Sequence, residues 1–127
     1  MALREKTKRR LKWTVIVAVT LACAAGGGYA LRIRQLDRRA VAKGAQGVTQ
    51  LAAGDYYNAL HNIGTYVQRH PTDAEALFQY ATARKHVEEP NGKHIVDAIR
   101  FYRRVLDLKP EHVEGSDALL ELYAGAG

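Results

Sequence analysis

Histidines and adjacent carboxylates are the residues of this 127-residue chain whose types could support catalysis or metal binding. The five histidines are His61, His70, His86, His94 and His112. No two of them have the i, i+4 spacing that places two imidazoles on one face of a helix, so we expect solvated or helix-capping histidines rather than metal ligands. Glu88 and Glu89 are neighbours on an expected turn, where their carboxylates point in different directions. No nucleophile stands beside a base at motif spacing, and no glycine-rich phosphate loop precedes a helix. We therefore expect no enzyme activity, no cofactor and no metal.

Charge is unevenly distributed along the chain, which has a net charge of +6. Residues 1–39 hold ten of the 19 Lys and Arg residues and two of the 13 acidic ones, so the remainder of the chain is mildly acidic. Such a part lacks the basic surface that a phosphate backbone requires, and we expect no nucleic-acid partner. The single Cys23 excludes an intramolecular disulfide.

Residues 13–31 form an apolar segment that contains no charged residue. As a helix this segment rises about 28 Å, close to the ~30 Å thickness of a bilayer's hydrocarbon core. We expect a transmembrane helix or signal anchor here, between a basic tail at 1–12 and a juxtamembrane helical linker at 32–39. Aromatic rings prefer the membrane interface and basic residues stop a span. The expected membrane-interface residues are Trp13, Tyr29, Arg32 and Arg34.

Other interpretations of this segment remain open. A signal peptide cleaved after Ala24 is one, favoured by the glycines at 26–28. Acylation of Cys23 as a lipoprotein is another, although Thr20 stands where a leucine is expected. Six basic residues precede the span and four follow it, which favours a cytoplasmic N-terminus. We expect a single-pass protein of the bacterial inner membrane with its C-terminal part in the periplasm; on a eukaryotic organelle that part would face the cytosol.

Turn signals divide the rest of the chain into short helices. Gly54 breaks one helix, Asp55 is placed to cap the next, and Pro71 ends it. Between them apolar residues recur every three or four positions, which indicates one face of an amphipathic helix. These residues are Tyr56, Ala59, Leu60, Ile63, Tyr66 and Val67. Thr72 and Glu75 then form a capping box for a following helix. Upstream, we expect a hinge near Gly44.

The same plan recurs further along the chain. Residues 88–94 predict a turn, Pro110 ends the next helix, and another apolar helix begins near Asp117. Four pairs of residues share an offset of 39: Ala59 with Ala98, Ile63 with Tyr102, Tyr66 with Val105, and Pro71 with Pro110. The turn at 88–94 is long, and removing about five residues there gives the ~34-residue period of a tetratricopeptide repeat.

The stretch from Leu51 to Pro71 resembles the second half of a tetratricopeptide repeat, with its Gly-Asp-aromatic turn, small residue and closing proline. The positions that carry the resemblance in the two units are Gly54, Ala59, Tyr66, Pro71, Tyr80, Ala81, Ala98, Tyr102 and Pro110. The resemblance implies an all-α fold, in which residues 40–124 form a right-handed superhelix of helical hairpins: about two repeats and the start of a third, before a tail at 125–127. The first unit departs from the pattern at Lys43, Gln46 and Gln50, where the family usually has large apolar residues.

The resemblance also implies a groove that binds a protein or peptide. Some members of the family clamp a chaperone's C-terminal carboxylate with basic and amide side chains. The equivalent positions here are Gly44, Val48, Gln79, Glu114 and Ala118, so this clamp is absent. The residues that we expect to face a partner in the groove are Lys43, Gln50, Gln79, Tyr80 and Arg84.

These features together predict a membrane-tethered adaptor or scaffold that binds a protein partner. Two alternatives remain open: a secreted periplasmic repeat protein released by signal cleavage, and the anchor and docking module of a longer enzyme. The leucines of residues 117–123 have no following helix to cover them. Either they all pack inward as a cap, or self-association or further repeats beyond Gly127 cover them.

Overall fold

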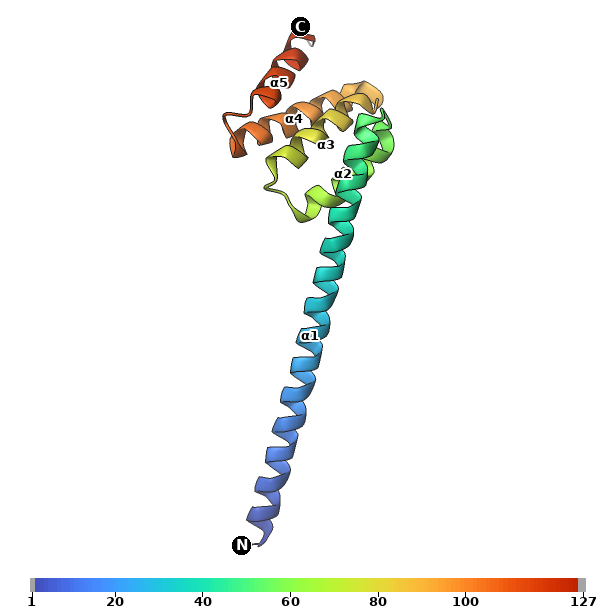
Figure 1. Cartoon of the computed structure of the whole chain (residues 1–127). Helices are drawn as coiled ribbons and strands as arrows, with labels where there is room; N and C mark the ends of the chain where they lie inside the picture. The colour runs from blue at the N-terminus through green and yellow to red at the C-terminus, as the bar shows by residue number, and fades with distance from the viewer. Residues whose placement is uncertain (1, 126–127) are drawn as a thin grey trace. The chain divides into compact units, whose positions relative to one another are not determined.

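The computed structural model describes residues 2–125, and the residues it describes are almost all helical, with no strand among them (Figure 1). The chain divides into two compact units, Met1–Asp37 and Arg38–Gly127. The first helix, α1 (Ala2–Ala52), contributes residues to both units. The prediction of an all-α fold is confirmed.

The first unit is the N-terminal part of α1. Every side chain that is described from Arg4 to Leu36 is exposed, including those of the apolar segment. Trp13 and Tyr29, near the two ends of this segment, are 64% and 69% exposed. The mean hydropathy of the most apolar 18-residue window is 1.8, so this helix is long and apolar enough to span a membrane. The glycines at 26–28 do not interrupt it, and the predicted linker at 32–39 is helical as well.

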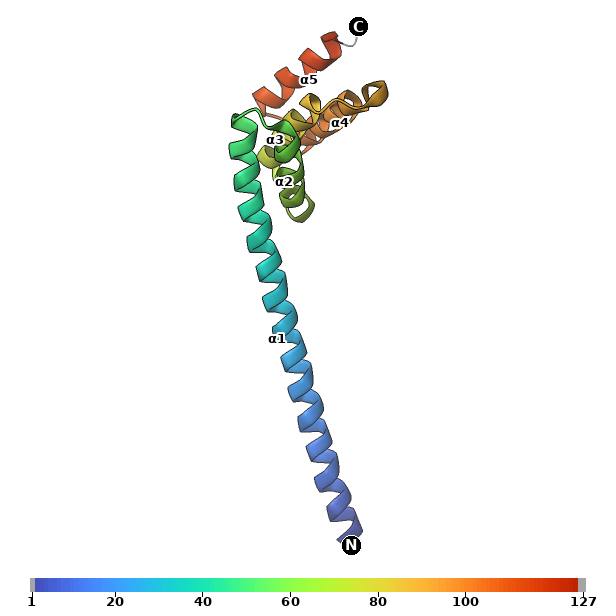
Figure 2. The same cartoon turned by 90° about the vertical axis from the view of Figure 1, so that its right-hand side faces the viewer.

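The second unit contains the end of α1 and four further α-helices. They are α2 (Tyr56–Arg69), α3 (Ala74–His86), α4 (Lys93–Leu108) and α5 (Val113–Gly125), with a 3₁₀ turn, η1 (Pro90–Gly92), before α4. From α3 onward each of these helices packs against the one that precedes it in the sequence. Figures 1 and 2 show α3 and α4 side by side, with the chain reversing at η1. Of the predicted C-terminal tail, Gly125 ends α5 and the other two residues lie outside the described part of the chain.

The helix boundaries follow the turn signals of the sequence. The Asp55 side chain caps α2 by accepting a hydrogen bond from the Asn58 amide, as predicted. The predicted capping box at Thr72 is wrong by one residue, because Asp73 is the N-cap of α3 and accepts from the Ala76 amide at 3.1 Å. With Asp73 as the N-cap, the third helical position is Ala76 rather than Glu75, and the Asp73 amide donates to the His70 carbonyl. Glu75 therefore has no role in a capping box and is available for another contact.

The turns at Pro71 and Pro110 have the same backbone hydrogen bonds, 39 residues apart. In each, the residue before the proline closes the preceding helix, and the next N-cap donates back to that residue. The bonds of the first turn are His70 N to Tyr66 O and Asp73 N to His70 O; those of the second are Lys109 N to Val105 O and His112 N to Lys109 O. Two turns far apart in the sequence are thus built by one local geometry.

The core consists of two clusters of buried residues. One cluster centres on Ala59, Ile63 and Ala83, between the end of α1, α2 and α3. The other centres on Ala81, Ala98 and Tyr102, between α3, α4 and α5. The Tyr102 hydroxyl donates to Thr82 Oγ1 at 2.9 Å, because the Thr82 hydroxyl itself donates to the Phe78 carbonyl. Burial raises the pKa of Tyr102, although the hydrogen bond with Thr82 partly opposes this.

The remaining positions that carry the repeat resemblance lie around these clusters. Tyr66 and Tyr80 are half-buried, and Gly54, Pro71 and Pro110 lie exposed in turns. Gly54 has a φ of +82°, a conformation that a glycine adopts without strain.

α5 divides its apolar residues between two sides. Leu119 and Leu122 pack against the second cluster, whereas Leu120 and Tyr123 are exposed. Of the two alternatives for this helix, the one in which all the leucines pack inward does not hold, because adjacent positions on a helix point about 100° apart and only one side of α5 meets α4.

The predicted hinge near Gly44 is also wrong, because α1 continues as a helix through Gly44 and Gly47. Both glycines are buried where α1 meets α2. A Cβ on Gly44 would lie 2.9 Å from Tyr66 Cγ, and one on Gly47 would lie 2.6 Å from Ile63 Cγ1 and 2.9 Å from the Ile63 amide nitrogen. The glycines therefore allow the close approach of α1 and α2, and they lie between Lys43, Gln46 and Gln50, the positions where the family usually has large apolar residues.

We predict that Gly47→Ala destabilises the second unit by about 1–3 kcal/mol, because the added methyl group collides with the backbone of α2. This loss exceeds the ~1 kcal/mol that alanine gains over glycine in helix propensity. Urea unfolding in a nonionic detergent, followed by circular dichroism, measures the change. Gly64→Ala is the matched control: its Cβ would meet only the edge of the Tyr80 ring, at 3.1 Å, and we expect a smaller loss. Equal stability of Gly47→Ala and the unchanged chain would contradict the proposed close packing.

Candidate partner-binding groove

A groove of about 280 Å³ lies within the second unit, between α1, α2 and the start of α3. Its lining combines aliphatic side chains with a few polar ones. The lining residues are Val41, Gly44, Ala45, Val48, Ile63, Tyr66, Asp73, Glu75, Ala76 and Gln79. An apolar surface with few polar groups is typical of a binding groove.

Small residues of two helices line the groove: Gly44 and Ala45 of α1 and Ala76 of α3. Gly44 lets α1 approach Tyr66 of α2, which also lines the groove. Val41 and Val48 are 49% and 40% exposed on the α1 wall, which leaves aliphatic surface open to a ligand.

Asp73 lines the groove but is engaged in holding the fold. Its Oδ1 accepts the capping hydrogen bond from the Ala76 amide, and its Oδ2 accepts a hydrogen bond of 2.8 Å from the Tyr66 hydroxyl. The Tyr66 ring in turn stacks on His70, with ring centroids 4.4 Å apart. We assign Asp73 to positioning the start of α3.

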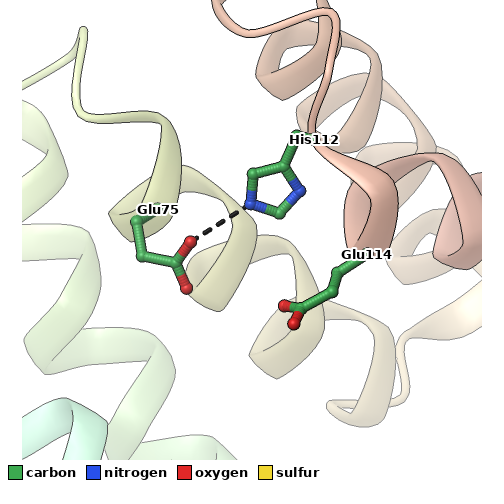
Figure 3. Close-up of side chains that lie close together, drawn as sticks. All are labelled: Glu75, His112 and Glu114. Atoms are coloured by element: carbon green, nitrogen blue, oxygen red, sulfur yellow. Dashed lines mark hydrogen bonds and ion pairs between the residues drawn. The ribbon is translucent and has the colours of Figure 1, made fainter.

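Glu75 forms a cluster with His112 and Glu114, shown in Figure 3. Glu75 comes from the first turn of α3, whereas His112 and Glu114 come from the start of α5. His112 Nε2 lies 3.1 Å from Glu75 Oε2, and the ligand atoms of all three residues lie within 4.8 Å of one another. The two carboxylates are directed toward each other across the gap (Figure 3).

The hydrogen bonds of His112 fix its tautomer. The Gly115 amide donates to His112 Nδ1 at 2.8 Å, so Nδ1 carries no proton and the neutral ring carries its proton on Nε2. That proton is donated to Glu75. His112 is therefore the N-cap of α5, at the position 39 residues after Asp73, the N-cap of α3. The absence of a Cβ at Gly115 leaves room for the ring, because a Cβ there would lie 3.0 Å from Nδ1.

This tautomer disfavours a metal ion at the cluster, although three potential ligands meet there. A histidine that binds a metal through Nε2 usually donates its Nδ1 proton to a carbonyl or carboxylate. Here Nδ1 faces the Gly115 amide, which is a donor. A metal ion on Nε2 would move the ring proton to Nδ1 and so break the hydrogen bond that caps α5. The arrangement suits a hydrogen-bonded helix cap with an acidic neighbour.

Of the five predicted groove residues, the structure places only Gln79 in the lining. Lys43 is exposed on α1 and does not line the groove. Gln50 accepts a hydrogen bond of 2.7 Å from Asn62 of α2. Tyr80 packs edge-on against Phe101 of α4 and lines a separate depression on the outer side of α2. These residues do not come together, and their role in binding a partner stays a prediction.

Arg84, the fifth of them, lies in an ion-pair network at the reversal between α3 and α4. Its guanidinium donates to Asp97 Oδ2 at 2.9 Å and lies 2.7 Å from Glu89 Oε1. This hydrogen bond from Arg84 holds the pKa of Asp97 below its ordinary value, although partial burial opposes the shift. The network ties the long turn to both helices.

Sequence reasoning missed the cluster of Glu75, His112 and Glu114. A usable signal was present, because the 39-residue offset aligns His112 with the capping Asp73. Three of the positions equivalent to the family's carboxylate clamp, Gly44, Val48 and Gln79, do line the groove.

No protein-family model matches the chain, and no curated protein matches it. The interpretation of the second unit as a tetratricopeptide-like array therefore depends on its own residues and packing.

We predict that His112→Ala lowers the free energy of unfolding by about 1–2 kcal/mol, because α5 loses its N-cap. His112→Asn restores a side-chain acceptor and recovers most of the capping contribution. Urea unfolding measures both variants, and amide hydrogen exchange at Gly115 reports on the cap directly. Exchange at Gly115 that is equally slow in all three proteins would contradict the assigned tautomer.

The pKa shift of Asp97 predicts an acid-sensitive contribution to stability. Because the folded-state pKa lies below the unfolded one, the stabilisation is present above the ordinary aspartate pKa of 3.8 and is lost as the pH falls through the folded value. Asp97→Asn should therefore reduce the loss of stability measured by urea unfolding below about pH 4. Asp107→Asn, at an exposed position of the same helix, is the control for the loss of one carboxylate, and the two variants are compared at each pH.

Proposed function

We propose that this chain is a membrane-tethered adaptor whose helical array binds a protein or peptide partner in the groove between α1, α2 and α3. The observation that carries the proposal is the groove itself: about 280 Å³, with the exposed side chains of Val41 and Val48 on its α1 side and one half-buried amide side chain, Gln79, on its α3 side. Amide side chains of this kind hydrogen-bond the backbone of a bound segment.

The architecture of the second unit supports this proposal. Its short helices bury their apolar faces against sequence neighbours, and the turns at Pro71 and Pro110 share one geometry. These are properties of a tetratricopeptide-like solenoid, whose right-handed superhelix is part of the proposal. In such arrays the repeat-to-repeat rotation creates a concave binding surface.

The tether is the second part of the proposal. A helix that spans the membrane with residues 13–31 confines the array to the membrane surface, which raises its effective concentration toward partners confined there. The charge difference between the two flanks favours a cytoplasmic N-terminus and an array in the periplasm of a bacterium. The chemistry of the role is binding, without a catalytic step.

We predict that a photo-crosslinking amino acid at Val48 and one at Gln79, on opposite walls of the groove, capture the same partner in carbonate-washed native membranes. The same probe at Arg103, on the exposed side of α4, is the control and should not capture it. Ala45→Trp fills the groove from an exposed position and should abolish the crosslink from Gln79. Three outcomes would contradict the proposal. The probes at Val48 and Gln79 could capture different partners, the crosslink from Gln79 could persist in Ala45→Trp, or the carbonate wash could remove the chain from the membranes.

A further inference from the structure

The groove has an acidic end at Glu75, and none of the described residues that line the groove is a lysine or an arginine. Glu75 lines the groove and is 60% exposed, and Glu114, also exposed, lies within 4.8 Å of it. Among the described residues, neither carboxylate forms an ion pair with a lysine or an arginine. Residues 110–127, which include α5, contain four acidic residues and no Lys or Arg. The arginines of α4, at positions 100, 103 and 104, line a different depression.

Two carboxylates this close repel each other, and a positive charge between them replaces repulsion with attraction. The positive ends of α3 and α5 offset part of the repulsion, since Glu75 and Glu114 both lie in first turns. His112 uses one oxygen of Glu75, Oε2, through its Nε2 proton. The other oxygen of Glu75 and the carboxylate of Glu114 remain available as acceptors.

The tautomer of His112 distinguishes between the two kinds of cation that such a cluster could take. A metal ion would compete for Nε2 and displace the proton that the Gly115 hydrogen bond places there. An ammonium or guanidinium group needs only carboxylate acceptors, and a guanidinium presents several donors in one plane. The geometry therefore favours an organic cation.

Aliphatic surface adjoins this acidic end. Val41, Ala45 and Val48 of α1 and Ala76 of α3 line the same groove as Glu75. A ligand that matches both features carries a positive side chain and an aliphatic one within a few residues of each other.

We propose that the groove recognises a basic, aliphatic peptide segment, in which an arginine or lysine pairs with Glu75 and Glu114 while a neighbouring aliphatic side chain contacts Val41 and Val48. This inference rests on the proposed function, since it names the chemistry of the partner for the same groove. It gives the groove a charge preference opposite to that of a carboxylate clamp.

The test uses the full chain in a nonionic detergent and three fluorescent octapeptides, with binding followed by fluorescence anisotropy. The peptides alternate leucine with arginine, leucine with glutamate, and serine with arginine. Glu75→Gln removes the charge of Glu75 but keeps a carbonyl oxygen that accepts the His112 proton, so the fold is retained. Glu114→Gln removes the charge of the second carboxylate. Glu88→Gln changes net charge equally at an exposed position outside the groove and is the matched control.

We expect the leucine–arginine peptide to bind most tightly, with a dissociation constant that rises about fivefold in Glu75→Gln and in Glu114→Gln and by less than about twofold in Glu88→Gln. Equal binding of the leucine–glutamate peptide, or an equal loss in Glu88→Gln, would overturn the inference. So would calorimetric Zn²⁺ binding that Glu75→Gln abolishes, because it would identify a metal site.

Ala45→Trp separates this inference from the proposed function. If it abolishes binding of all three peptides while the charge variants have no effect, the groove binds a partner but the charge preference is wrong. If it leaves arginine-dependent binding intact, the peptides bind elsewhere, and both proposals fail.

Discussion

The close approach of α1 to α2 at Gly44 and Gly47 is the contact on which the second unit depends. At Gly47 the distance from an imagined Cβ to the Ile63 backbone is too short for any side chain, so α2 can lie where it does only against a glycine. The position of α2 determines where Tyr66 holds Asp73, and Asp73 determines where α3 begins. Gly44 and Ile63, which take part in this contact, also line the groove, so the groove depends on the close approach of the α1 and α2 backbones.

α3 and α5 begin with the same capping geometry, in which a side chain accepts a hydrogen bond from the backbone, but the capping side chains differ. Asp73 and His112 occupy equivalent caps, and each accepts from an amide three residues ahead. The carboxylate of Asp73 has a second oxygen to spare for Tyr66, whereas the imidazole of His112 has a proton to donate to Glu75. The second cap therefore links α5 to α3 and brings an acidic side chain to the end of the groove. In our proposal, the same three residues also contribute to recognition of the partner.

Sequence patterns predicted the elements better than the groove. Proline, glycine and aspartate signals placed the ends of α2 and α4 correctly, because these signals act within a few residues. The hinge at Gly44 was wrong, because a glycine's effect depends on whether another helix lies against it, and no local pattern reports that. Tyr80 and Arg84 were assigned to the groove from family positions, yet their partners, Phe101 and Asp97, belong to α4 and come near only after the chain reverses at η1. The apolar helix at 13–31 was predictable because length and composition suffice for it.

The placement of aromatic residues divides the protein into two optically distinct parts. Trp13 is the only tryptophan and lies in the first unit, whereas six of the seven tyrosines lie in the second. Indole emission therefore reports on the surroundings of the apolar segment alone, such as its transfer from detergent into lipid. Tyrosine signals report almost entirely on the helical array. Insertion and unfolding are thus spectroscopically separable in the unmodified chain, without any introduced label.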